Sequence, residues 1–219
     1  MKTLSEFSLF QNIVAEHLRM LETEADTLSM PRHSFVYLPD DAAQVVYFLQ
    51  SGIVKIGNHT DDGREIIREI LHPGSTFGEL ALLGQTSRQN FAKVMQPCTL
   101  WVLTTRSLRR VLRESNQLSD NLLNRVGNRL MRTERRLEGL IFKDARQRIV
   151  DFLLDTAHRR GRRVGYETHF KHNLTQQDIA NLTGTSRQTV TSVLNDLRKE
   201  NLIYFTRKSM LIRDLEKLS

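Results

Sequence analysis

The stretch that decides the fold lies at residues 174–190 and reads Leu174-Thr175-Gln176-Gln177-Asp178-Ile179-Ala180-Asn181-Leu182-Thr183-Gly184-Thr185-Ser186-Arg187-Gln188-Thr189-Val190. Thr175 followed by Asp178 is typical of a capping box, so the pattern predicts a helix over Gln176–Thr183. Gly184 can end this helix, because glycine adopts the left-handed conformation at little steric cost. Ser186 has a side chain that can cap a second helix. The stretch therefore predicts two helices joined by a tight turn.

The spacing inside this stretch favours a helix-turn-helix over an ordinary helical hairpin, which is the alternative. Small Ala180, turn-forming Gly184 and β-branched Val190 are placed as two tightly crossed helices require. The charge distribution agrees. The net charge is +7; residues 1–110 hold 11 Lys and Arg against 12 Asp and Glu, whereas residues 111–219 hold 21 against 13. Because the positive excess lies in the half that carries the motif, we predict double-stranded DNA as its partner, against the alternative of a solvated basic surface.

The outward side chains of the second helix are the candidates for base contacts. Arg187 can pair bidentately with guanine and Gln188 with adenine, and either can instead hold a phosphate. Residues 202–205 and 210–212 look like a β-hairpin wing whose basic tip contacts phosphate. The predicted DNA-binding residues are Thr175, Gln176, Ser186, Arg187, Gln188, Thr191, Ser192, Asn195, Arg207 and Lys208.

Residues 34–104 have a different texture, with short β-type runs separated by turn signals such as Asp62-Gly63. Many short strands at regular spacing predict a small antiparallel barrel or jelly roll. The fold class is therefore α+β. We predict a β-barrel domain at 1–115, a dimerisation helix at 116–143 and a winged helix-turn-helix domain at 144–219.

The predicted long helix has apolar residues spaced 3, 4, 3, 4, 3, which is the a/d rhythm of a coiled coil. This seam needs a partner, and the heptad register favours a parallel homodimer over packing against the barrel of the same chain. One seam position is polar, Thr133, which either sets the register or contacts a ligand. The seam residues are Leu123, Val126, Leu130, Thr133, Leu137 and Leu140.

With these residues in view, the whole chain resembles the Crp–Fnr family of bacterial transcription regulators. The resemblance rests on residues 174–190 and on Phe77-Gly78-Glu79-Leu80-Ala81-Leu82-Leu83 leading to Arg88. In cyclic-nucleotide-binding members, this second stretch is a phosphate-binding cassette, in which backbone amides and the Arg hold the cyclic phosphate and the Glu binds the ribose. Thr133 matches the threonine that contacts the adenine. The resemblance implies an effector site at Gly78, Glu79, Leu80, Arg88, Gln89 and Thr133, and RNA polymerase as a partner.

Several residues depart from the family pattern. Gln89 and Asn90 stand where nucleotide-binding members usually have Ser or Thr and then Ala, and the Glu-to-Arg spacing is one residue short. Cyclic AMP is therefore disfavoured as the effector relative to another small molecule or none. On the recognition helix, Gln188 replaces a Glu and Ser192 an Arg. Because Gln suits adenine whereas Glu suits cytosine, we expect an operator different from the usual family palindrome.

Other classes of site find little support in the sequence. Cys98 is the only cysteine, so we expect a buried thiol and no disulfide or cysteine-ligated iron–sulfur cluster, and neither haem nor metal is expected. His169 and His172 are expected at the surface. No signal peptide or apolar span is evident, so we expect a cytoplasmic protein with no membrane partner.

Two rivals stay open. The first is a constitutive DNA-binding regulator whose barrel is only a scaffold for dimerisation and polymerase contact. The second is a cupin-like enzyme, for which His59 and His72 are too isolated to build a metal site.

Overall fold

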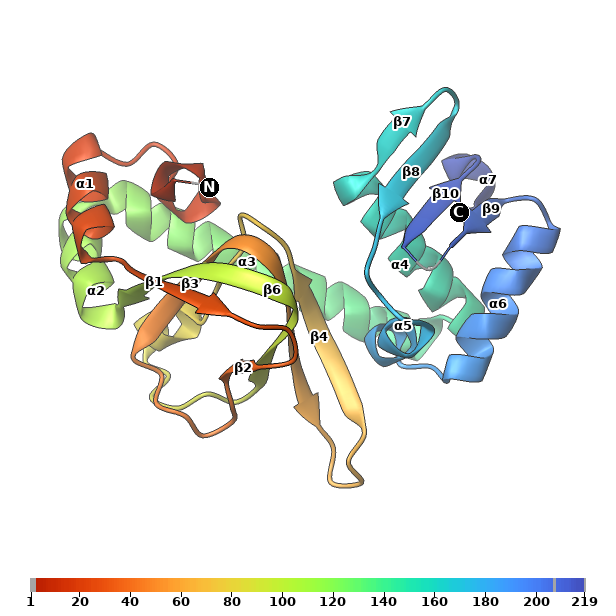
Figure 1. Ribbon diagram of the computed structural model, residues 1–219, viewed down its shortest axis with the longest axis horizontal. Coiled ribbons are helices and arrows are strands. Elements are labelled where there is room, and N and C mark those ends of the chain that lie inside the picture. The colour runs from red at the N-terminus through yellow and green to blue at the C-terminus, as the bar shows by residue number, and fades with distance from the viewer. Residues whose placement is uncertain (1–2, 207, 219) are drawn as a thin grey trace. The chain divides into compact units, whose positions relative to one another are not determined.

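The computed structural model describes residues 3–206 and 208–218. The chain forms two compact units, with the boundary after Arg132 (Figure 1). A long helix, α3 (Asn116–Phe142), contributes residues to both units. The other elements of the N-terminal unit are η1 Leu4–Glu6, η2 Ser8–Phe10, α1 Ala15–Glu24, β1 Asp26–Met30, β2 Phe35–Tyr37, β3 Val45–His59, β4 Glu65–Leu71, β5 Thr76–Phe77, η3 Glu79–Leu83, β6 Phe91–Thr104 and α2 Thr105–Glu114.

The N-terminal sheet is antiparallel, as the sequence predicts. Its strand order is β1-β6-β3-β4, with β2 also paired to β6 and β5 to β3. The predicted turn at Asp62-Gly63 joins β3 to β4, and Gly63 has a φ of 79°. One detail differs from the expectation: the sheet is open rather than closed into a barrel, because β1 and β4 stand at opposite ends of the strand order.

Strand β3 is buried on both faces, which explains its continuous apolar run. Val46 and Phe48 pack into a core formed with the N-terminal helices and α2. Tyr47 and Leu49, which alternate with them, belong to a second cluster between the strands. Since successive side chains of a strand point to opposite faces, β3 is the layer that holds the two clusters together.

The C-terminal unit is built on the predicted helix-turn-helix. Its four-stranded sheet has the order β7-β8-β10-β9. The hairpin of β9 and β10 is the predicted wing, whereas the hairpin of β7 and β8 has no counterpart in the sequence prediction. The elements are α4 Ala145–Arg160, β7 Arg162–Val164, β8 Glu167–Lys171, α5 Gln176–Thr183, α6 Arg187–Lys199, β9 Ile203–Phe205, β10 Ser209–Ile212 and α7 Leu215–Leu218.

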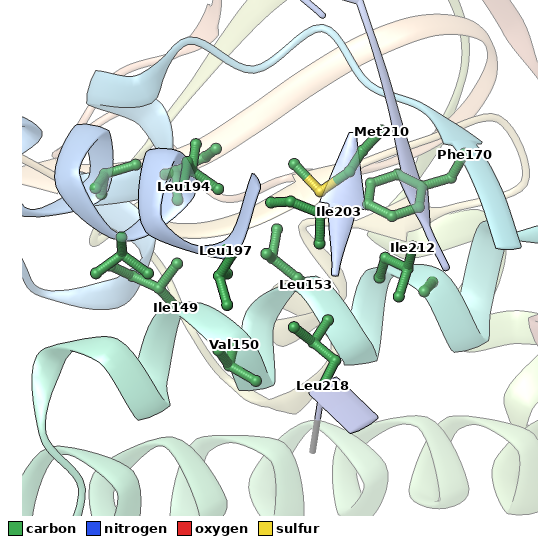
Figure 2. Close-up of a cluster of buried hydrophobic side chains, with 14 of the residues drawn as sticks. Ile149, Val150, Leu153, Phe170, Leu194, Leu197, Ile203, Met210, Ile212 and Leu218 are labelled. Carbon is green, nitrogen blue, oxygen red and sulfur yellow. The ribbon is translucent and has the colours of Figure 1, made fainter. Parts of the chain in front are cut away.

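A single hydrophobic core holds this unit together (Figure 2). Side chains of α4 meet the inner face of α6 and the apolar side chains of the small sheet. One face of α6 is thereby fixed, and the opposite face is left for solvent or a partner. The labelled members are Ile149, Val150, Leu153, Phe170, Leu194, Leu197, Ile203, Met210, Ile212 and Leu218.

Helix α3 is covered at its start and uncovered along most of the predicted seam. Leu118 and Leu122 are buried in the N-terminal core, and Val126 packs half-buried against it. The four seam leucines are at least half exposed in the single chain: Leu123, Leu130, Leu137 and Leu140. Among the described residues, no helix is both long and apolar enough to cross a membrane.

Candidate DNA interface and effector pocket

The helix-turn-helix has the helix ends that the sequence predicts. The Thr175 hydroxyl accepts a hydrogen bond from the Asp178 backbone N–H at 3.1 Å, and the Asp178 carboxylate accepts one from the Thr175 N–H at 2.9 Å. Gly184 ends α5 with a φ of 64°, and the Ser186 hydroxyl accepts from the Thr189 N–H at 3.0 Å. The capping box, the turn glycine and the second cap are therefore confirmed.

The outer face of α6 presents three of the predicted base-contacting side chains. Arg187, Gln188 and Ser192 are exposed, and Asn195 is half-exposed. Ser192 has an intrahelical partner, because its hydroxyl lies 3.4 Å from the carboxylate of Asp196. In the described part of the chain, neither Arg187 nor Gln188 makes a side-chain hydrogen bond, so both are available to a ligand such as a base edge.

Thr191 differs from these residues, because its hydroxyl already has protein partners. It donates to Oε1 of Gln176 at 2.6 Å and also lies 2.9 Å from the carbonyl oxygen of Arg187. This contact joins α5 to the recognition helix and leaves the two N–H groups of the Gln176 carboxamide outside the bond. Thr175 is likewise engaged, since its hydroxyl is part of the cap.

The wing carries one described basic residue at its tip. Lys208 is exposed, and its backbone N–H donates to the Thr206 hydroxyl at 3.3 Å, which tightens the turn. Arg207, also predicted to contact DNA, lies outside the described residues.

In the N-terminal unit, the Arg88 side chain is buried and hydrogen-bonded to backbone carbonyls of distant residues in the same chain. It is only 2% exposed. The guanidinium donates to the carbonyl oxygens of Gly78 at 3.1 Å and Val45 at 2.5 Å, and it lies 4.7 Å from the ring centre of Tyr37. Gly78 has a φ of 81°, and a Cβ there would come within 2.9 Å of Arg88. Glycine is therefore favoured at this position by its positive φ, and an added Cβ would also press on the Arg88 guanidinium.

Glu79 is also engaged by the chain itself. Its carboxylate is buried, and Oε1 accepts from the guanidinium of Arg129 at 3.1 Å, with Arg125 3.6 Å away. Both arginines belong to α3, and Arg125 also donates to the Thr76 carbonyl. The carboxylate that the family resemblance assigns to a ribose is thus neutralised from the long helix.

The remaining residues of the predicted effector site do not all line the small cavity beside Arg88. Gln89 points to solvent, and its carbonyl accepts from Asn58 at 2.6 Å, whereas neighbouring Asn90 is buried and accepts from the Tyr37 hydroxyl at 3.2 Å. Burial raises the pKa of Tyr37, the nearby Arg88 charge opposing the shift, so the phenol stays a neutral donor. Thr133 belongs to the C-terminal unit, so its predicted ligand contact stays a prediction.

The cavity has a volume of about 20 Å³. This is close to the room that a single water molecule needs, whereas small-molecule sites measure roughly 300 Å³ or more. The residues present therefore do not fit a cyclic nucleotide in this conformation. Those that line the cavity include Tyr37, Thr76, Gly78, Leu80, Gln85, Arg88, Asn90 and Arg129.

Several of these residues were missed from the sequence. Arg125 and Arg129 lie one helical turn apart on α3, but the arginine-rich flanks of the seam gave no sign that these two face Glu79. Tyr37 and Asn90 approach each other across 53 residues of chain, which no local pattern reveals.

Two smaller expectations concern histidine and cysteine. Cys98 is buried as predicted, and burial raises the pKa of its thiol to about 11. The surface expectation was wrong for His172, which is 7% exposed and whose backbone N–H donates to the Lys208 carbonyl of the wing at 2.8 Å. Among residues 3–206 and 208–218, no three His, Cys, Asp or Glu side chains gather as metal ligands.

Two family models match the chain, one for each end. Residues 27–115 match the cyclic nucleotide-binding domain, and residues 147–219 match the Crp-like helix-turn-helix domain. A "CRP-like cAMP-activated global transcriptional regulator" of Mycobacterium tuberculosis is 32% identical over 99% of this chain and 96% of its own length. A "Global nitrogen regulator" of Synechocystis is 33% identical over 86% of this chain and 84% of its own.

Solved structures agree on the fold. A CooA mutant from Carboxydothermus hydrogenoformans matches with a TM-score of 0.81 at 25% identity, covering 100% of this chain and 94% of that one. FixK2 from Bradyrhizobium japonicum matches with a TM-score of 0.80 at 23% identity, covering 89% and 95%. Sensor sheet, long helix and winged helix-turn-helix together define a DNA-binding transcription regulator with a sensor domain of the cyclic-nucleotide-binding type. The chain belongs to the Crp–Fnr family.

Proposed function

We propose that the chain acts as a parallel homodimer on a two-fold symmetric DNA site. The observation that carries this proposal is the uncovered seam of α3 in a chain whose recognition helix presents Arg187 and Gln188 to solvent. Two copies would place two α6 helices in successive major grooves, about 34 Å apart. The protein thus works as a regulator in the cytoplasm, where bacterial DNA lies, rather than as an enzyme, with RNA polymerase as a further partner. The division at 1–115, 116–143 and 144–219 is part of this proposal.

The charges beside the seam support the parallel arrangement. With Leu130 and Leu137 at a positions, Arg129 occupies a g position and Glu134 the e position five residues later. In a parallel coiled coil, such g and e side chains lie near each other across the two helices. Glu134 of one copy would therefore add a second carboxylate beside Arg129 of the other, whose guanidinium already pairs with Glu79 of its own chain at 3.1 Å. Opposite charges at these positions favour the parallel register.

We assign direct base contacts to Arg187 and Gln188, and phosphate contacts to Lys208 and the cap residues Thr175 and Ser186. Ser192 and Asn195 supply further contacts along the groove. Thr191 positions Gln176 through its 2.6 Å hydrogen bond rather than contacting DNA alone. For Arg207, the role stays the one predicted from the sequence, which is a contact with DNA.

We further propose that cyclic AMP is not the effector. Supporting this are the cavity of about 20 Å³, the engagement of Arg88 by two carbonyls, and the pairing of Glu79 with α3. Gly78, Leu80 and Thr133 keep a role only if another small molecule enters. Without one, the chain is a constitutive DNA binder.

The test is selection of binding sites from random DNA, followed by titration of the selected duplex with and without cyclic AMP. We expect a two-fold symmetric site with adenine opposite Gln188, a steep loss of affinity with salt, and equal affinity with and without the nucleotide. Recovery of the usual family palindrome would overturn the specificity assignment. A gain in affinity of about tenfold or more with cyclic AMP, a normal size for allosteric coupling, would overturn the effector assignment.

A further inference from the structure

One guanidinium joins three segments at the base of the helix-turn-helix. Arg148, in the first turn of α4, donates from Nη1 to the carbonyl oxygen of Lys143 at 2.7 Å. Its Nε donates to the carbonyl of Thr183 at 2.9 Å and its Nη2 to that of Gly184 at 3.2 Å. Lys143 directly follows α3, whereas Thr183 and Gly184 end α5. A single side chain thus links the end of the long helix to the turn of the DNA-binding motif.

These three carbonyls are places where a cation is favoured. The last carbonyls of a helix lack intrahelical donors and carry the negative end of the helix dipole. The Arg148 guanidinium supplies this cation at the ends of both α3 and α5. The planar fork of a guanidinium can reach carbonyls in two directions, whereas the ammonium of lysine is a single point.

A second contact lies beside the first. A Cβ added to Gly184 would come within 3.1 Å of Cδ2 of Leu140, so the turn between α5 and α6 rests on the last turns of α3. Leu140 is the final residue of the seam and is half exposed in the single chain. The side chain that a second copy would cover is therefore the one against which the turn packs.

From these contacts we propose that Arg148 is a positioning residue, which fixes the helix-turn-helix to the end of α3 and so sets the distance between the two recognition helices of the dimer. This inference rests on the proposed homodimer. The segment at 143–144 is then a braced joint: Arg148 ties Lys143 to α5, and the Asp144 side chain caps α4 by accepting from the Gln147 N–H at 2.8 Å.

The experiment compares full-length wild type with Arg148→Lys and Arg148→Gln on a family of duplexes. The two half-sites of the selected operator are kept, and one or two base pairs are added or removed between them. Arg146→Gln is the matched control: Arg146 lies in the same turn of α4, but its guanidinium pairs with the exposed carboxylate of Glu200 at 2.8 Å rather than with a carbonyl at the end of α3.

For wild type and Arg146→Gln, we expect affinity to fall at least about tenfold when the spacing changes. Losing the links to α3 should lower the affinity of both Arg148 variants for the best spacing by about tenfold. It should also flatten their spacing profile to within about threefold. An unchanged profile, or a parallel loss at every spacing, would overturn the proposal, because a general loss of stability weakens all sites alike. A wild type that binds without any spacing preference would instead refute the proposed dimer.

A measurement without DNA keeps the proposal testable if the variants bind too weakly. Spin labels at Ser192→Cys report the distance between the two recognition helices. Cys98 is buried and burial raises the pKa of its thiol, so we expect the label to react at the introduced cysteine. We expect one narrow distance distribution in wild type and a clearly broader one in Arg148→Gln, at equal helix content by circular dichroism. Distributions of equal width would overturn the proposal.

Discussion

Replacing Arg88 by methionine separates a ligand-binding arginine from a structural one. An arginine held in place for an absent anion is a buried charge that destabilises the free protein, so its removal should be neutral or stabilising. An arginine whose guanidinium satisfies carbonyl groups of its own chain stabilises the protein, so its removal should be destabilising. The two carbonyl partners and the nearby Tyr37 ring indicate the second case, so Arg88→Met should destabilise the N-terminal unit.

The magnitude follows from the contacts that are lost. Two charge-assisted hydrogen bonds disappear, and the carbonyls of Gly78 and Val45 are left in a buried place at about 1–3 kcal/mol each. The contact with the Tyr37 ring, 4.7 Å from the guanidinium carbon, contributes about 1 kcal/mol more. The guanidinium no longer has to be desolvated, which offsets part of the loss. We expect a net destabilisation of about 2–4 kcal/mol.

The assay is equilibrium unfolding in denaturant followed by the fluorescence of Trp101. This is the only tryptophan of the chain and lies in the N-terminal unit, so the signal reports on that unit alone. Arg109→Met is the matched control, because exposed Arg109 donates to a single carbonyl, that of Ala81, at 3.0 Å. It should cost less than about 1 kcal/mol. An Arg88→Met unit as stable as wild type would refute the reasoning.

Four further outcomes are expected. Leu130→Glu places like charges in the seam and should shift the dimer to monomer in sedimentation velocity without lowering helix content. Gln188→Glu should change the preferred base from adenine to cytosine in site selection, with little effect on stability. Thr191→Val removes the bond to Gln176 and should weaken DNA binding several-fold at constant melting temperature, whereas Thr191→Ser should not. Burial, and secondarily the charge of Arg160, holds the pKa of His172 below its ordinary 6.5, so the unfolded chain takes up a proton first. The His172 contribution to the stability of the C-terminal unit should therefore be fully present above about pH 6.5 and be lost as the pH falls below that value. Thermal unfolding measured above and below about pH 6.5 should show a smaller loss in His172→Gln.

The parts of the fold that the sequence predicted are those with local signals. The capping box at Thr175 and the turn at Gly184 depend on contacts within four residues, and both lie where they were placed. The effector pocket was predicted from a sequence motif, but the side chains of that motif bond to residues far away in the sequence. Arg88 bonds to Val45 across 43 residues, and Glu79 pairs with Arg129 across 50. No periodicity carries that information, because the partners meet only after the sheet and α3 have packed.

Those distant partners also decide how any effector could act on this chain. A ligand large enough to use Arg88 must take it from the carbonyls of Gly78 and Val45, and one that uses Glu79 must take it from Arg129. Arg129 lies on α3, so an ionic link joins the pocket to the helix. Since a ligand shifts an equilibrium only through its differential affinity for two states, an effector here would favour the state in which this link is broken. Its action on α3 would therefore be to release the helix from the pocket.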